Sequence, residues 1–309
     1  MKIGIIGAGL AGLTAARHLA DAGHAITLFD KARGPGGRMS TRRTETPQGM
    51  AFFDHGAQYF TVRDPGFAET VTRWEADGIV ARWPAADENA WVGMPGMNAI
   101  IKAEAAPHDV RWNCRIESIA REGTGWRLTH AEGDEIFDAA IVAVPAEQVA
   151  PLLDEHAPEW AALAEQTVSK PCWTVMAAFA DRVDHAADVL RNDGAIGWAA
   201  RNSAKPGRTG PESWVIQASP DWSTEHLEDE AGDVIAALMT DLARATRSAL
   251  PDTVVVQAHR WRYALSGAAG RTLLWDEGSR LGVCGDWLVG PRIESAWVSG
   301  RTLAAAMLR

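Results

Sequence analysis

The spacing of apolar residues predicts a strand, a helix and a second strand at the amino terminus. Residues 3–6 (IGII) are continuously apolar, residues 10–18 continue at helical spacing, and residues 25–29 (AITLF) form another apolar run. Short apolar strands that alternate with a helix are typical of a βαβ unit in a parallel sheet.

The glycines between this strand and helix predict a dinucleotide site. Gly7, Gly9 and Gly12 form G-x-G-x-x-G directly after the strand. In this motif the first glycine permits a tight turn, the second lets the backbone approach a pyrophosphate, and the third lets helix and strand pack closely. Ala11 lies in the same turn, and Asp30 ends the second strand, where its carboxylate can bind a ribose diol. The alternative is a glycine-rich turn that binds nothing.

A second glycine-rich loop follows at once and favours FAD over NAD. Residues 31–41 (KARGPGGRMST) offer further backbone N–H groups and a guanidinium to the same phosphates. The candidate cofactor contacts in this loop are Lys31, Gly37, Arg38 and Met39.

Two later apolar runs fit the same parallel sheet. Residues 139–145 (AAIVAVP) and 280–286 (RLGVCGD) are typical of buried strands; the second ends in Asp286, and a helical pattern follows that includes Ile293. An acid at a strand end beside a helix N-terminus suits a ribityl chain, and the helix dipole stabilises a reduced flavin. The four segments together predict FAD. We expect it to be non-covalent, because no cysteine precedes the final strand where attachment would occur.

The middle of the chain shows the patterns of further sheets. Residues 110–144 indicate an antiparallel meander, and residues 205–211 (KPGRTGP) indicate an exposed hairpin or loop. The stretch from 151 to 262 indicates a second sheet backed by helices. Its expected elements are strands at 172–180, 195–200, 213–218 and 253–261 and a helix at 224–248 with Ser223 as N-cap.

These patterns predict an α/β flavoprotein with two domains. We expect a Rossmann-type FAD-binding domain, discontinuous in sequence, at residues 1–60, 105–150 and 265–309. A mixed-sheet substrate domain is expected at residues 61–104 and 151–264.

Composition and charge limit the possible partners. The 309 residues are 47% hydrophobic and 23% charged, the balance of a globular protein. The formal net charge of −10 argues against a nucleic-acid surface, which needs clustered Lys and Arg. The longest uncharged stretch, residues 3–16, is too short to cross a bilayer, which takes about 20 apolar residues. No membrane partner is therefore expected.

The three cysteines indicate a cytoplasmic protein without a metal site. Cys114, Cys172 and Cys284 lie far apart, and no two form a C-x-x-C pair. A disulfide framework and a zinc site are both unexpected, and a reducing compartment fits. The sequence pattern leaves the oligomeric state open.

The stretch Asp54–Phe60 (DHGAQYF) is a more specific motif than the glycine turns. We expect it to lie beside the flavin ring, where backbone groups bond to flavin N3 and O4. The expected contacts are His55, Gly56, Ala57 and Gln58. The alternative is a strand and turn in which His55 is simply hydrogen-bonded.

The order of these segments resembles the flavin amine oxidase superfamily. Within it, residues 30–43 (DKARGPGGRMSTRR) and 52–64 (FFDHGAQYFTVRD) resemble the bacterial renalases. The resemblance covers nearly the whole chain and implies a fold similar to p-hydroxybenzoate hydroxylase. The implied activity is oxidation of the 2- and 6-dihydro isomers of NAD(P)H to β-NAD(P)⁺. In this reaction hydride passes to FAD, and O₂ then reoxidises the flavin and is reduced to H₂O₂. The resemblance to such flavoproteins also implies that the backbone of Ile116 pairs with adenine.

The substrate pocket needs a flat surface beside the flavin rather than an acid–base triad. The candidates are Tyr59, His259, Trp261 and Tyr263. On a strand, alternation sends the last three to one face, which could contact a nicotinamide. The alternative is a half-buried strand that only packs.

Two other functions remain open from the sequence. One is an amine oxidase or desaturase that acts on an apolar amine. Many amine oxidases hold a lysine near the flavin, but Lys102, Lys170 and Lys205 lie in no recognisable context for that role. The other is a non-enzymatic binding or escort protein with the same fold.

Overall fold

The computed structural model, which describes residues 1–309, is built around a six-stranded sheet. The strand order is β17-β18-β11-β1-β2-β7. The strands from β18 to β7 run parallel, and β17 is antiparallel at one edge. The bounds are β1 Lys2–Ile6, β2 Ala25–Phe29, β7 Asp109–Arg111, β11 Ala139–Val142, β17 Leu274–Asp276 and β18 Leu281–Val283.

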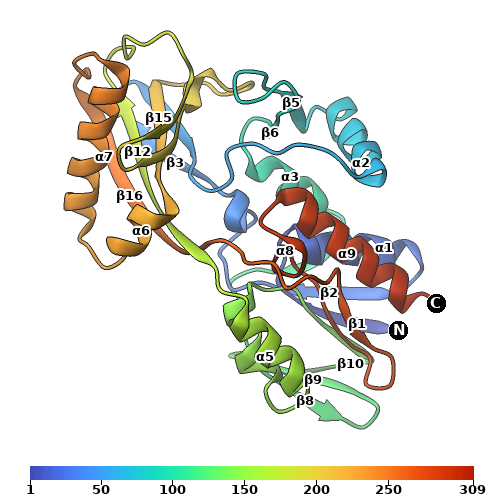
Figure 1. Ribbon diagram of the computed structural model, residues 1–309. Helices are drawn as coiled ribbons and strands as arrows, with labels where there is room; N and C mark the ends of the chain where they lie inside the picture. Colours follow the sequence, from blue (N-terminus) through green and yellow to red (C-terminus); the bar gives the residue numbers. More distant parts are fainter.

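Helices from both ends of the chain pack together on this sheet (Figure 1). α1 (Leu10–Asp21) contacts both α9 (Ile293–Met307) and α3 (Asn98–Ala105), while α8 (Asp286–Val289) leads into α9. The leucines of α1 are buried because they face the sheet and α9. The Rossmann-type unit expected from the amino-terminal pattern is confirmed.

A second, antiparallel sheet forms the other large part of the molecule. Its strand order is β13-β14-β15-β12-β16. The apolar side chains Val234, Leu238 and Leu242 of α7 (Ala231–Thr246) pack on one face. The strand bounds are β12 Lys170–Phe179, β13 Val189–Asp193, β14 Ile196–Arg201, β15 Glu212–Ala218 and β16 Thr253–Leu265.

A hairpin from the amino-terminal part covers the opposite face of this second sheet. The hairpin consists of β3 (Thr41–Thr46) and β4 (Gly49–Asp54). Phe53 packs in one apolar cluster with Met176 and Val215 of the sheet. The end of β4, and with it the Asp54–Phe60 motif, is thereby placed between the two sheets.

The expected meander is confirmed for three strands, β8 (Ile116–Glu122), β9 (Gly125–His130) and β10 (Gly133–Phe137). Residues 109–111 belong instead to the parallel sheet, because they pair with β2. Figure 1 shows the meander beside α5, at the end of the molecule remote from α7. The remaining bounds are α2 Pro65–Ala76, α4 Ala150–Leu153, α5 Pro158–Gln166, α6 Pro220–Glu225, β5 Val80–Arg82, β6 Trp91–Gly93 and the 3-10 helices Gly37–Met39, Ala146–Gln148 and Asn202–Ala204.

The prediction of a single long helix at 224–248 is wrong. The segment forms α6 and α7, and the N-cap of α6 is Ser219, whose Oγ accepts from Trp222 N. Ser223 is buried within α6, where its Oγ accepts from Trp173 N. The helix breaks where the carboxylate of Glu228 pairs with two arginines of β16, an attraction that the local pattern does not reveal.

The residue boundaries of the two domains stay a prediction. Phe67, Trp74 and Ile101, from the segment expected in the substrate domain, share one apolar core with Leu13 and with α9. No helix in the structure combines the length and apolar character that a membrane crossing requires.

Candidate cofactor and substrate site

The first glycine turn has the shape that a pyrophosphate needs. A Cβ on Gly7 would lie 2.4 Å from Ala143 O, and one on Gly12 would lie 2.1 Å from Gly7 O, so both positions exclude a side chain. A Cβ on Gly9 would meet nothing within 4 Å. The backbone at Gly9 therefore faces open space at the start of α1, where the helix dipole favours an anion. The turn fits the phosphates of a dinucleotide.

Asp30 ties the first turn to the second. Its Oδ2 accepts from Ala8 N and its Oδ1 from Ala32 N, both at 2.8 Å. The carboxylate is thus fixed at the end of β2, with lone pairs left to accept from a ribose. Lys31 points elsewhere, since its Nζ donates to Gln148 Oε1 at 2.7 Å.

The second glycine loop meets the carboxy-terminal acid. Arg38 lies 2.6 Å from Asp286, measured from guanidinium nitrogen to Oδ1, although 248 positions separate the two residues. The other carboxylate oxygen accepts from Ser266 Oγ at 3.0 Å. Gly37 faces open space, and Met39 is buried beneath the loop. The second glycine loop and the carboxy-terminal candidate segment are therefore neighbours, although they lie far apart in sequence.

The turn of the DHGAQYF motif packs directly on this loop. Ala57 N donates to Arg38 O at 2.8 Å, and a Cβ on Gly56 would lie only 2.1 Å from the same oxygen. The Gly56 carbonyl accepts from Gln58 Nε2 at 3.0 Å and from Gln217 Nε2 at 2.7 Å. Side chains from both parts of the molecule thus hold the turn.

Three candidate residues form a histidine–tryptophan cluster, which we define as His55, His259 and Trp261. The ring of His55 lies 5.1 Å from that of His259 and 5.2 Å from that of Trp261. Trp261 Nε1 donates to His55 O at 2.8 Å. The Nδ1 of His55 has no partner although the residue is only 5% exposed. Strand β16 therefore does lie over the turn.

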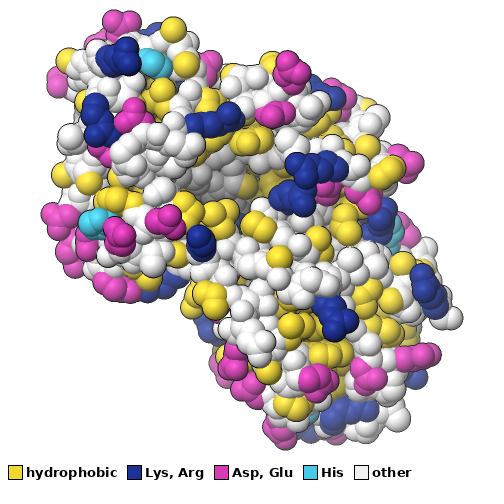
Figure 2. All heavy atoms as spheres, viewed as in Figure 1, with side chains coloured by type: hydrophobic (Ala, Val, Ile, Leu, Met, Phe, Trp, Pro, Cys, Tyr) yellow, Lys and Arg dark blue, Asp and Glu magenta, His cyan; other side chains and the backbone are white.

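The remaining candidates lie apart from this cluster. Tyr59 packs on Trp198, with ring centroids 5.2 Å apart. Tyr263 is 41% exposed, because the end of β16 lies at the surface. Ile116 is buried at the start of β8, and Ile293 begins α9. Figure 2 shows the surface hollowed between the part that carries α7 and the part that carries α2.

Both imidazoles of the cluster are neutral near pH 7. Burial lowers the pKa of His55 to about 4, helped by His259 and Arg42. Burial and Arg42 likewise lower the pKa of His259 to about 4. The cluster therefore offers flat, uncharged rings, with Arg42 as the permanent charge beside them.

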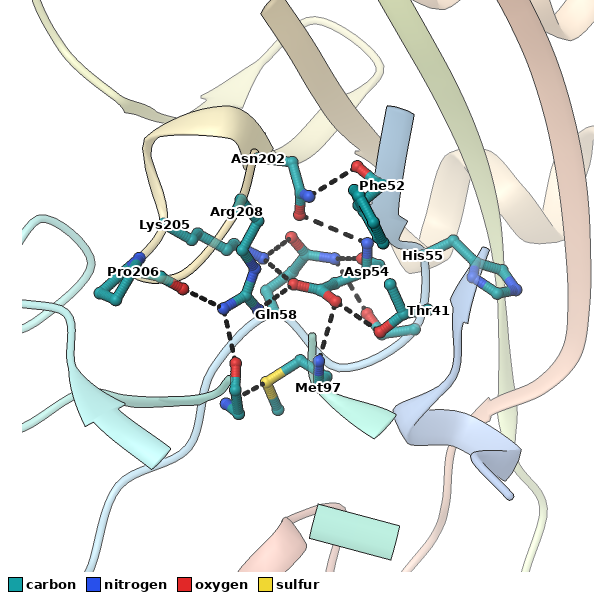
Figure 3. Close-up of polar contacts among 12 residues, drawn as sticks. Thr41, Phe52, Asp54, His55, Gln58, Met97, Asn202, Lys205, Pro206 and Arg208 are labelled. Carbon is teal, nitrogen blue, oxygen red and sulfur yellow. Dashed lines mark hydrogen bonds and ion pairs between the residues drawn. The ribbon is translucent and has the colours of Figure 1, made fainter. Parts of the chain in front are cut away.

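Asp54, Lys205 and Arg208 form a group of ion pairs that we call the buried ion cluster (Figure 3). The sequence pattern does not predict this cluster. The Nζ of Lys205 lies 3.3 Å from Asp54 Oδ2 and donates to Gln58 Oε1 at 3.1 Å. A guanidinium nitrogen of Arg208 donates to the same carboxylate oxygen. Thr41 Oγ1 completes the set of side-chain donors to Asp54 at 2.7 Å.

The expected exposure of residues 205–211 is therefore wrong for the two cations. The side chains of Lys205 and Arg208 are 0% and 1% exposed, because the loop folds inward onto Asp54. No local pattern signals this, since charged residues in a loop rich in proline and glycine are usually solvated. Figure 3 also shows His55 pointing away from the Asp54 carboxylate, as successive residues of an extended chain do.

The arrangement can bind a flavin dinucleotide and present a flat donor to it. The glycine turns and Asp30 suit the phosphates and ribose. The Gly56 turn lies beside the aromatic cluster, but its Gly56 carbonyl and Ala57 N–H already have protein partners. No group of three His, Cys, Asp or Glu side chains is arranged to hold a metal ion.

Comparison with protein families gives two matches along the chain. Residues 5–74 match the model of the NAD(P)-binding Rossmann-like domain. Residues 80–308 match the model of flavin-containing amine oxidoreductases, which covers more than half of the chain. The predicted FAD cofactor is thereby confirmed.

Curated relatives match only in part. A bifunctional protein of tRNA 5-methylaminomethyl-2-thiouridine biosynthesis from Ralstonia nicotianae is 26% identical over an alignment of 195 positions that covers 45% of this chain and 30% of that protein. A 4,4'-diapophytoene desaturase from Staphylococcus aureus is 52% identical over 40 residues, 13% of this chain and 8% of the desaturase. The chain thus matches less than a third of the length of either relative.

Solved structures share the fold over the full length. A protein provisionally described as a protoporphyrinogen oxidase from Exiguobacterium has a TM-score of 0.78 at 13% identity, with 99% of this chain and 98% of that chain covered. Cyclohexylamine oxidase from Brevibacterium oxydans has a TM-score of 0.73 at 13% identity, with the same coverage. At this identity the likeness establishes the two-part flavoprotein fold.

Proposed function

This chain belongs to the family of flavin-containing amine oxidoreductases, and from that membership we propose that it oxidises the 2- and 6-dihydro isomers of NAD(P)H, as a renalase does. A hydride leaves C2 or C6 of the dihydropyridine with its bonding electrons, and β-NAD(P)⁺ forms. Bound FAD would supply the hydride acceptor, and O₂ would be the final oxidant, taking up two electrons and two protons to give H₂O₂. A cytoplasmic location stays a prediction from the cysteine pattern.

The observation that carries the proposal is the buried histidine–tryptophan cluster packed on the Gly56 turn, where Trp261 Nε1 donates to His55 O at 2.8 Å and both imidazoles have lowered pKa values. An amine is mostly an ammonium ion near pH 7 and must lose a proton before it gives up a hydride. A base whose pKa is about 4 is poorly matched to that task. A dihydronicotinamide has no such proton to lose, so neutral His55 and His259 suit it.

The residues of the site would orient the donor rather than move protons. The rings of His259 and Trp261 stand at 76° to each other, so a nicotinamide would stack on one of them and meet the other edge-on. The bond from Trp261 Nε1 to His55 O fixes this face relative to the Gly56 turn. Gln58 and Gln217 hold the turn itself through the Gly56 carbonyl.

An amine oxidase or a desaturase is the second candidate. Its support is the family match and the names of relatives with a similar fold or segment, a cyclohexylamine oxidase and a diapophytoene desaturase. The guanidinium of Arg42 beside the cluster opposes it for amines, because a cationic substrate would be repelled there.

Anaerobic mixing separates the two candidates. The FAD-loaded protein is mixed with 2- or 6-dihydro-NAD, and bleaching of the flavin absorption is followed by stopped flow. We expect rapid bleaching with these isomers and an oxidised flavin with benzylamine or spermine. If the amines bleached the flavin faster than the dihydronicotinamides, the amine oxidase would be the correct assignment.

A further inference from the structure

Arg42 is a half-buried cation in the site that pairs with no carboxylate. It lies on β3 and faces β16, where its guanidinium nitrogens reach Gln257 Oε1 at 3.4 Å and His259 Nδ1 at 3.5 Å. Both partners are neutral, and both distances lie at the outer limit of a hydrogen bond. The guanidinium of Arg42 therefore has N–H donors left for a further, stronger acceptor.

Other arginines shielded from solvent do have anionic partners. Arg38 pairs with Asp286, Arg201 with Glu212 and Arg208 with Asp54. This is the usual arrangement, because an ion shielded from water is costly unless it is paired. Arg42 is an exception to this arrangement. In the same part of the site, the buried Nδ1 of His55 also has no hydrogen-bond partner. Both observations indicate that a ligand completes this corner of the site.

We propose that Arg42 binds the 5′-phosphate of the nicotinamide nucleotide and so selects phosphate-bearing donors. The inference rests on the proposed function and names the substrate feature that the site recognises. A planar guanidinium can donate two parallel bonds to a phosphate, which a lysine cannot reproduce. Arg42 stands next to His259, so a nicotinamide stacked on the histidine–tryptophan cluster would have its ribose phosphate within reach.

The test uses donors that differ only in phosphate. FAD-loaded wild type, Arg42→Ala and Arg42→Gln are mixed anaerobically with the 6-dihydro forms of nicotinamide riboside and nicotinamide mononucleotide. We expect wild type to favour the mononucleotide, and each Arg42 variant to lose about 10- to 100-fold in kcat/KM for it. The loss with the riboside should be smaller, so the ratio of kcat/KM for the mononucleotide to kcat/KM for the riboside should fall in both variants.

The neighbouring arginine supplies the matched control. Arg43 follows Arg42 on β3 but is exposed and lines a different, small cavity together with Lys102. Arg43→Ala should keep the preference for the mononucleotide. If Arg43→Ala lost the preference and Arg42→Ala kept it, the phosphate site would lie at that cavity and the proposal for Arg42 would be wrong.

A binding measurement makes the test independent of turnover. Oxidised nicotinamide mononucleotide and nicotinamide riboside are titrated into the FAD-loaded protein, and the shift of the flavin absorption spectrum gives Kd. We expect Arg42→Ala to remove the advantage of the mononucleotide. An advantage that survives in both Arg42 variants overturns the proposal. A wild type that no dihydronicotinamide reduces overturns the proposed function instead, and the titration still decides the role of Arg42.

Discussion

Lys205 and Asp54 form an ion pair that is wholly shielded from solvent, with Nζ 3.3 Å from Oδ2 and both side chains 0% exposed. Arg208 reaches the same oxygen, so the buried ion cluster holds two cations and one anion. The pair joins the loop after Asn202 to the end of β4, and through Gln58 it supports the Gly56 turn. The second sheet is thereby connected to the segment beside the expected flavin ring.

Replacing the anion of this cluster should destabilise the whole protein. Asp54→Asn leaves two buried cations without a carboxylate, and breaking a buried pair in this way costs about 3–5 kcal/mol. We expect that loss in the free energy of unfolding, measured with urea. The matched control is Asp221→Asn, since Asp221 pairs with Lys170 but is 91% exposed and should cost under about 1 kcal/mol. Equal losses in the two variants would contradict the assigned burial.

The same carboxylate should contribute to unfolding in acid. Burial alone raises the pKa of Asp54, but Lys205 and Arg208 outweigh it and lower the pKa from 3.8 to about 2. The unfolded chain therefore binds more protons between these values, so the contribution is complete above about pH 4 and is lost as the pH falls through about 2. Urea unfolding between these pH values should show a shallower loss of stability in Asp54→Asn than in wild type.

Flavin reduction by the proposed donor should depend little on pH. His55 and His259 have pKa values of about 4 and stay neutral at higher pH, and a hydride donor needs no deprotonation. We expect the anaerobic reduction rate to be flat from about pH 5.5 to 7.5 and to change only as the pH approaches 4. A tenfold rise per pH unit across that range would indicate an amine that must first lose a proton.

FAD affinity should depend on Asp30 and Arg38. Asp30→Ala removes a charged hydrogen-bond acceptor and should weaken FAD binding by about 1–3 kcal/mol. Arg38→Lys loses the planar fork and should lower FAD occupancy. Titration of the FAD-free protein gives both Kd values, with Arg33→Lys as the control because Arg33 is exposed in the same loop. An unchanged Kd in Arg38→Lys would remove Arg38 from the cofactor site.

The bound FAD should be released when the protein is denatured. Cys284 directly follows β18 and is buried. Burial raises the pKa of its thiol to about 12, so the thiol is a poor nucleophile for covalent attachment of the flavin. After acid precipitation we expect the yellow colour in the supernatant. Colour that stays in the pellet would show a covalent link.

The parts of the molecule that depend on local interactions follow from the order of the residues alone. Gly7 and Gly12 are required by backbone contacts within one strand–turn–helix unit, so their spacing predicts that unit and its dinucleotide chemistry. The buried apolar runs likewise predicted the parallel strands and most strands of the second sheet. His259 and Trp261 could be assigned to one face from strand alternation alone.

Which charges are buried, and which remain unpaired, depends on how distant segments of the chain pack together. Lys205 lies 151 positions from Asp54, and Arg42 lies 217 positions from His259. Whether such residues meet depends on how the hairpin of β3 and β4 packs on the second sheet, and no local spacing encodes that. A charged residue in a loop has the same sequence signature whether water or a distant carboxylate surrounds it, because its burial is a property of the packed molecule.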